Sequence, residues 1–209
     1  MLNLNKLSPP SLSHLQPLNR NERSIMRIIS GSAGRRQIRV PGSVARPSTD
    51  RLREALFSIL ADRVRGARVM DLFAGSGALG LECLSRGAES CVFVDSSKES
   101  QQVIAKNLKS LQLAGGRVNA RDVFRALQGG GDYDLIFADP PYTKKSGDVD
   151  YIEKLLVDEH LGSCMAENAM LVLEDSTANK RGTYDGWELL DQRSYGGCGI
   201  LFYQRQSTR

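Results

Sequence analysis

The chain has 209 residues, of which 41% are hydrophobic and 25% are charged, and its formal net charge is +4. These values are typical of a globular protein with one sizeable core. No apolar run reaches the roughly 18 residues that a membrane span needs, and the N-terminus lacks the apolar segment of a secretory signal. We therefore expect a cytoplasmic protein without a membrane partner.

The positive charge is concentrated near the N-terminus. Residues 23–68 contain eleven arginines and three acidic residues, whereas residues 69–209 carry a net negative charge. Arginine forks pair with phosphates and stack on bases, which favours a nucleic-acid partner. A solvated basic face is the alternative.

The cysteines give no sign of a metal site or a disulfide framework. No C-x-x-C pair occurs, and all four lie among apolar or small residues: Cys83, Cys91, Cys164 and Cys198. We expect reduced cysteines that pack in the interior, and no bound metal.

Three regions follow one another along the chain: residues 1–25, 26–45 and 46–209. The first is rich in Ser, Pro, Asn and Leu without a sustained period, which is typical of a disordered extension. In the second, two short β-prone runs flank a glycine-containing turn and predict a β-hairpin. This hairpin is basic, and its arginines are Arg27, Arg35, Arg36 and Arg39.

The third region predicts an α/β domain. Ser48 or Thr49 can cap a first helix whose apolar face comprises Leu52, Leu56, Ile59 and Leu60. Five expected strands then alternate with helices: 68–73, 90–95, 117–120, 133–138 and 169–174. The four helices between these strands are expected at about 78–86, 98–111, 123–127 and 149–161. Such alternation indicates a Rossmann-like, mostly parallel sheet that helices cover on both faces. A final hairpin, at 187–193 and 199–204, adds two antiparallel strands and brings the expected total to seven.

A glycine-rich loop follows the first strand of this domain. The segment from Asp71 to Gly80 satisfies G-x-G-x-x-G, and Asp95 ends the next strand twenty residues after Gly75. This pattern alone suggests a dinucleotide site and leaves an NAD-dependent oxidoreductase open. However, the Asp71 carboxylate would repel a pyrophosphate, whereas it would attract the ammonium of S-adenosylmethionine, which has no phosphate. Asp122 could accept the adenine amino group or cap the helix that follows it.

Asp139-Pro140-Pro141-Tyr142 follows the strand at 133–138. Both prolines fix the backbone in extended conformations. The Asp139 carboxylate and the Pro140 carbonyl can then accept two hydrogen bonds from one exocyclic NH₂ group, and Tyr142 offers a ring for base stacking. A plain turn after a buried strand is the alternative reading of these four residues.

These motifs together resemble a known family. D-x-F-x-G-x-G, an acid ending the second strand and D-P-P-Y look like the class I S-adenosylmethionine-dependent methyltransferases that act on exocyclic amines. M-R-I-I-x-G, R-P-S-T-D-R-L-R-E-A-L-F and D-L-F-A-G-S-G-A-L-G-L-E resemble, more narrowly, the bacterial 16S rRNA guanine-N2 methyltransferase family, RsmD. The resemblance covers residues 26–204, although the hairpin tip, Gly-Ser-Ala-Gly, departs from the family pattern.

The resemblance implies methylation of the N2 amine of a guanine in ribosomal RNA or a small-subunit assembly intermediate, by a monomer. Residues implied to hold S-adenosylmethionine are Asp71, Phe73, Gly75, Ser76 and Gly77 at the methionine end, Asp95 at the ribose, Asp122 and Val123 at the adenine, and Arg46, Pro47 and Thr49 along one side. Those implied to grip the guanine are Asp139, Pro140, Pro141 and Tyr142. The four hairpin arginines would lie on the RNA.

Other functions remain open at this point. The same acceptor pair would suit the amine of adenine or cytosine, so a DNA adenine-N6 or cytosine-N4 methyltransferase is one alternative. A noncatalytic RNA-binding assembly factor with the same fold is another. The choice of guanine rests on the family resemblance alone.

Overall fold

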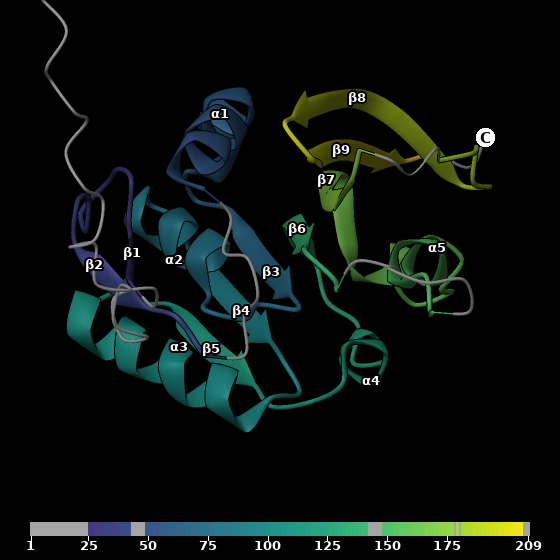
Figure 1. Ribbon diagram of the computed structural model, residues 1–209. Coiled ribbons are helices and arrows are strands. Elements are labelled where there is room, and N and C mark those ends of the chain that lie inside the picture. Colours follow the sequence, from purple (N-terminus) through teal and green to yellow (C-terminus); the bar gives the residue numbers. More distant parts are fainter. Residues whose placement is uncertain (1–24, 43–48, 142–147, 178, 180, 207–209) are drawn as a thin grey trace, which may run out of the picture.

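The computed structural model describes residues 25–42, 49–141, 148–177, 179 and 181–206. Its main sheet has seven strands in the order β5-β4-β3-β6-β7-β9-β8 (Figure 1). Neighbours from β5 to β7 run parallel, and β9 and β8 run antiparallel at one edge. This confirms the expected sheet with its C-terminal hairpin. The bounds are β3 Arg68–Leu72, β4 Ser90–Val94, β5 Gly116–Asn119, β6 Tyr133–Ala138, β7 Met165–Ser176, β8 Trp187–Tyr195 and β9 Cys198–Arg205.

Helices cover both faces of this sheet. Successive residues of β6 alternate between two cores: Leu135 and Phe137 face one side, and Ile136 and Ala138 face the other. The first core is shared with α1 (Asp50–Leu60), α2 (Ala78–Ser85), α3 (Lys98–Leu111) and the N-terminal hairpin; the second is shared with α4 (Val123–Leu127) and α5 (Tyr151–Leu156). A strand buried on both faces reads as a continuous apolar run, which is why these strands were visible in the sequence.

Three elements differ from expectation. Helix α5 is shorter than 149–161, because it begins after its N-cap Asp150 and the chain turns at Val157. Strand β7 is longer than 169–174, because pairing with β9 continues to Ser176. Ile59 was expected on the buried face of α1 and is 38% exposed.

The buried face of α1 is rotated toward two other residues. Leu52, Leu56 and Leu60 form the expected ridge, and Arg53 and Phe57, each one position further on, are buried beside it. Positions i+1 and i+5 extend an i, i+4, i+8 ridge on one side, which leaves Ile59 at the margin.

The N-terminal hairpin consists of β1 (Ile25–Arg27) and β2 (Gln37–Arg39) and packs against α2 and α3 (Figure 1). Its residues Ile28, Ala33 and Ile38 are buried in the same core as the sheet. The expected boundary between residues 45 and 46 stays a prediction, and residues 1–24 of the expected extension lie outside the described residues. None of the helices in the described parts of the chain is long and apolar enough to cross a membrane.

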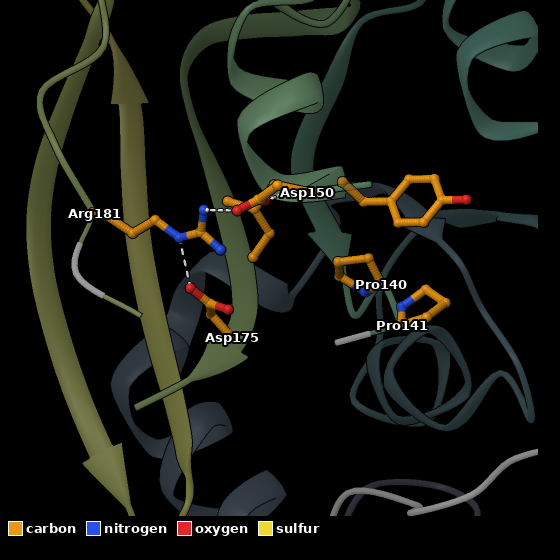
Figure 2. Close-up of a pocket in the computed structure, with 7 residues that line it drawn as sticks. Pro140, Pro141, Asp150, Asp175 and Arg181 are labelled. Carbon is orange, nitrogen blue, oxygen red and sulfur yellow. Dashed lines mark hydrogen bonds and ion pairs between the residues drawn. The ribbon is translucent and has the colours of Figure 1, made fainter. Parts of the chain in front are cut away.

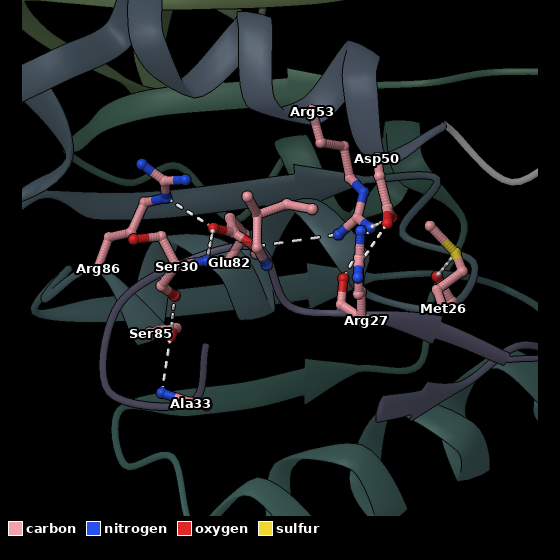
Figure 3. Close-up of polar contacts among 12 residues, drawn as sticks. Met26, Arg27, Ser30, Ala33, Asp50, Arg53, Glu82, Ser85 and Arg86 are labelled. Carbon is pink, nitrogen blue, oxygen red and sulfur yellow. Dashed lines mark hydrogen bonds and ion pairs between the residues drawn. The ribbon is translucent and has the colours of Figure 1, made fainter. Parts of the chain in front are cut away.

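A buried ionic cluster fixes the hairpin to α1 and α2 (Figure 3). Glu82 on α2 is fully buried and accepts hydrogen bonds from the backbone N–H groups of Ile29 (2.7 Å) and Ser30 (3.0 Å) and from Arg86 Nε (2.7 Å). Arg53 on α1 is equally buried; it donates to the Arg27 carbonyl (2.7 Å), and its Nη1 lies 3.9 Å from Glu82. Burial lowers the pKa of Arg53, and the carboxylate of Glu82 opposes that shift.

A second contact joins the hairpin to the glycine loop. The side-chain carboxamide of Asn107 on α3 accepts from Arg39 N (2.9 Å) and donates to the Arg39 carbonyl (3.0 Å). The same amide nitrogen donates to the carbonyl of Ser76 in the loop (3.1 Å). Strand β2 and the loop are therefore bound to one side chain.

Replacing Glu82 with alanine should lower the free energy of unfolding by about 3–5 kcal/mol, because it leaves the backbone N–H groups of Ile29 and Ser30 without their acceptor and the buried Arg53 with Asp50 as its remaining carboxylate partner. Urea denaturation measures this difference. Glu89→Ala, on an exposed residue of the following turn, is the matched control and should change stability by less than about 0.5 kcal/mol. Equal effects of the two variants would contradict this account of the cluster.

Candidate functional site

Four acidic side chains gather where four adjacent strands end. Asp71, Asp95, Asp139 and Glu174 lie at the carboxyl ends of β3, β4, β6 and β7. The chain leaves β3 toward β4 on one side and later returns to pair with it through β6 on the other, so the strand order reverses at β3. Open α/β sheets bind ligands at such a reversal, beyond the carboxyl ends of the strands.

Asp71 is a buried acid with a perturbed pKa. The residue is 3% exposed, and its Oδ2 accepts a hydrogen bond from Gly80 N at 3.0 Å. Burial and the nearby charge of Asp95 raise the pKa of Asp71 to about 7, although the Gly80 N–H opposes the shift. A ligand that carries positive charge would stabilise the ionised form, whereas a pyrophosphate would be repelled.

Asp139 is perturbed in the same direction. Burial raises its pKa well above the usual range, and the charges of Glu174 and Asp71 add to this shift. Pro140 is buried and Pro141 is exposed. The prolines restrict the backbone directly after Asp139, so the carboxylate is held at the strand end. Tyr142 lies outside the described residues.

The glycine loop has an unusual backbone. Phe73, Gly75 and Gly77 have φ values of 56°, 53° and 76°, and for Phe73 this left-handed conformation carries strain. A Cβ atom on Gly77 would lie 3.1 Å from Ile104 and 3.2 Å from Phe93, so the loop has no room for a larger residue there.

Asp95, the residue predicted to bind the ribose, holds this loop through hydrogen bonds. Asp95 accepts from the backbone N–H groups of Gly75 and Ser97, each at 2.8 Å and each through a different carboxylate oxygen. Every carboxylate oxygen has two acceptor sites, so further hydrogen bonds to a ligand remain open. Ser76 is buried and its hydroxyl contacts Met26 Sδ at 3.9 Å, which gives it a role in packing the loop.

Two other predicted residues cap helices. Asp122 Oδ1 accepts from the N–H groups of Phe124 (3.0 Å) and Arg125 (3.3 Å) at the start of α4, as one of its two expected roles requires. Thr49 Oγ1 accepts from Leu52 N (3.2 Å) at the start of α1. Val123 is buried in the core beneath α4. Arg46 and Pro47 lie outside the described residues.

The hairpin arginines differ from one another. Arg36 donates to the carbonyls of Leu111 (2.9 Å) and Ser110 at the end of α3, and Arg27 pairs with Asp50 at 2.6 Å. Arg35 and Arg39 are exposed, and their side chains make no hydrogen bond or ion pair with the described residues. These two are therefore the most open to an external anion.

Sequence reasoning missed Glu174 and Arg181. Leu173 on β7 pairs with Ala138 on β6, so Glu174 lies beside Asp139. Arg181 binds Asp150 and Asp175, each at 2.6 Å, next to a cavity of about 10 Å³ that Pro140 and Pro141 also line (Figure 2). The pairing of β6 with β7 places Glu174, and ion pairs with Asp150 and Asp175 place Arg181; both are long-range contacts that no local pattern in the sequence shows.

Arg181 joins the end of the segment that begins with Asp139 to the adjacent strand β7. Asp150 ends this segment as the N-cap of α5, and Asp175 lies on the adjacent strand β7. The side chains of Arg181 and Asp175 are 8% and 5% exposed. The pair is therefore largely shielded from water, which strengthens its attraction.

Replacing Arg181 with methionine should lower the free energy of unfolding by about 3–5 kcal/mol, because Asp175 would be left buried without its cationic partner. Arg193→Met is the control, since Arg193 makes a similar bond to Asp191 at 2.8 Å at an exposed position, worth less than about 1 kcal/mol. Urea denaturation measures the free energy of unfolding of both variants. A cost for Arg181→Met no larger than that of the control would refute the assigned role.

Comparisons with known proteins show the family and the fold. The model of a family described as "Conserved hypothetical protein 95" matches residues 26–204. The chain is 35% identical to "Putative rRNA methyltransferase YlbH" of Bacillus subtilis, over 87% of this chain and 100% of the relative. It is 35% identical to "Ribosomal RNA small subunit methyltransferase D" of Escherichia coli, over 87% and 91%.

A solved structure gives the same result. "Putative methyltransferase yhhF from Escherichia coli" superposes with a TM-score of 0.75 at 33% identity, over 88% of this chain and 99% of that one. The Rossmann-like class I fold and the resemblance stated from the motifs are thereby confirmed. The chain belongs to the conserved hypothetical protein 95 family, which is the RsmD family of methyltransferases.

Proposed function

We propose that this protein transfers a methyl group from S-adenosylmethionine to the exocyclic N2 amine of a guanine in small-subunit ribosomal RNA. The observation that carries the proposal is the pair of acids with raised pKa values, Asp71 and Asp139, at the carboxyl ends of the adjacent strands β3 and β6, where the strand order reverses. The Escherichia coli relative, named as a small-subunit ribosomal RNA methyltransferase, supports the choice of RNA. The choice of guanine follows the RsmD family.

The residues at the glycine loop fit S-adenosylmethionine. Asp71 is a buried carboxylate with spare acceptor capacity, and a cationic amino-acid group would stabilise its charge. Gly75 and Gly77 hold the loop at positive φ, and because they have no side chains a ligand could approach the loop backbone closely. Asp95 would hold the ribose hydroxyls and Asp122 the adenine amine, with Arg46, Pro47 and Thr49 along one side. The bound molecule supplies a methyl group on a positively charged sulfur.

Asp139 would act on the target amine. The nitrogen of guanine N2 is a poor nucleophile, because its lone pair is delocalised into the ring. Hydrogen bonds from its N–H groups to Asp139 and to the Pro140 carbonyl would favour a pyramidal nitrogen aimed at the methyl group. Its raised pKa also makes Asp139 a good acceptor for the proton that the nitrogen loses on methylation. Tyr142 would stack on the base.

Affinity for S-adenosylmethionine should rise with pH up to about 7 and then level off. Below that pKa Asp71 is protonated and neutral, so it no longer attracts the ammonium group. The expected slope is at most about tenfold per pH unit, and Asp71→Asn should weaken binding and flatten this slope. Calorimetric titrations between pH 5.5 and 8 measure it, with Asp62→Asn as an exposed control. Wild-type affinity that is equal across this range would argue against the role of Asp71.

Asp139→Asn should reduce kcat by about 10²-fold or more while S-adenosylmethionine binds as in the wild type. The asparagine retains one acceptor but loses the charge and the proton-accepting capacity. Transfer of a tritiated methyl group to small-subunit RNA, assembly intermediates and duplex DNA gives the rate and the preferred polymer. The expected product is N2-methylguanosine. Full turnover by the variant, or a methylated adenine or cytosine in DNA, would overturn the assignment.

A further inference from the structure

The surface of α4 contains an open pocket that extends beyond the proposed adenine contact at Asp122, and no cofactor role is proposed for its other lining residues. Its volume is about 430 Å³, and it is lined by Ala120, Arg121, Asp122, Arg125 and Gln128. Arg121, Arg125 and Gln128 are spaced by four and three residues, so they line one face of the short helix and its first turn. All three are exposed.

The pocket presents mainly hydrogen-bond donors. Two guanidinium groups and one carboxamide face it, and neither Arg121 nor Arg125 pairs with a carboxylate among the described residues. Asp122 is the acidic residue of the lining, and its Oδ1 already accepts two backbone N–H groups of α4. Arginine forks match the geometry of phosphate oxygens.

A third cation and two rings lie on α4 and α5, outside the lining of the pocket. Lys154 Nζ on α5 lies 3.9 Å from the centre of the Phe124 ring, which holds the ammonium group beside α4. Phe124 in turn stacks on Tyr151 with ring centres 6.5 Å apart. Cations next to partly exposed rings are typical of surfaces that bind nucleic-acid strands.

The pocket lies on the opposite side of the sheet from the hairpin. Helix α4 packs in the core shared with α5, and the hairpin packs in the core shared with α1, α2 and α3 (Figure 1). Arg121 follows the end of β5 by two residues, so the pocket is at the carboxyl edge of the sheet. The pocket and the four acids of the candidate site therefore lie at the same edge of the sheet.

We propose that Arg121 and Arg125, assisted by Lys154, bind backbone phosphates of the RNA on the α4 side of the site. This inference rests on the proposed function, because a polyanion must approach acids that repel it. Cations on one side alone would leave the strand free to pivot away. On the hairpin side Arg39, whose carbonyl shares Asn107 with the glycine loop, lies closest to the site, so the strand is held on both sides of the target nucleotide.

The test compares two double charge reversals of equal size. Arg121→Glu with Arg125→Glu alters the pocket, and Arg63→Glu with Arg65→Glu alters exposed arginines that precede β3, at the other end of the sheet. RNA affinity is measured by fluorescence anisotropy between about 50 and 300 mM salt, with calorimetric titration of S-adenosylmethionine alongside. The milder pair Arg121→Gln with Arg125→Gln covers the case in which the reversal fails to fold.

The pocket variants should bind RNA at least about tenfold more weakly near 100 mM salt, with a log–log salt slope shallower by about 1.4–1.8 for two lost phosphate contacts. KM for RNA should rise while cofactor affinity stays unchanged. Pocket variants whose RNA affinity and slope match those of the control pair would overturn the proposal and leave a solvated basic face.

Failure of the proposed function is a separate outcome. Wild-type protein that binds RNA without methylating it would overturn the proposed reaction, while the same comparison of salt slopes would still decide whether the pocket binds the strand.

Discussion

The burial of Glu82 is the constraint on which the arrangement of the site depends. This side chain has no access to water, and it binds two backbone N–H groups of the hairpin as well as Arg86. A buried carboxylate is stable only when its acceptor sites are filled, so the hairpin must dock for α2 to pack. Since α2 starts directly after the glycine loop, the position of the loop and that of the hairpin are determined together.

The second constraint is the crowding of negative charge at the strand ends. The charges of Glu174 and Asp71 add to the burial that raises the pKa of Asp139, and the charge of Asp95 adds to the burial that raises that of Asp71. A structure that only needed stability would place apolar residues there. The acids are instead retained at the one edge of the sheet where a cationic ligand and an amine could relieve the repulsion, which agrees with the membership in a methyltransferase family.

Elements with strong local signals were predictable from the sequence. Helices α3 and α4 and strand β6 have the expected bounds, because caps and apolar runs define them locally. Contacts made through tertiary packing were not predictable. The roles of Glu174 and Arg181 depend on strand register, and nothing local distinguishes Arg36, which caps α3, from the exposed Arg35 beside it. The motifs in the sequence pointed to Asp71 and Asp139, but the rise in the pKa of each could be derived only from the structure.

The Asn107 carboxamide has a consequence for how the protein opens. It hydrogen-bonds to Arg39 on the hairpin and to Ser76 in the glycine loop, and it is almost fully buried. Detaching the hairpin from α3 breaks the first pair of bonds and releases the amide that holds the loop. The two segments therefore belong to one cooperative unit of local unfolding. Fraying of the basic hairpin and disorder of the glycine loop are, in energetic terms, the same event.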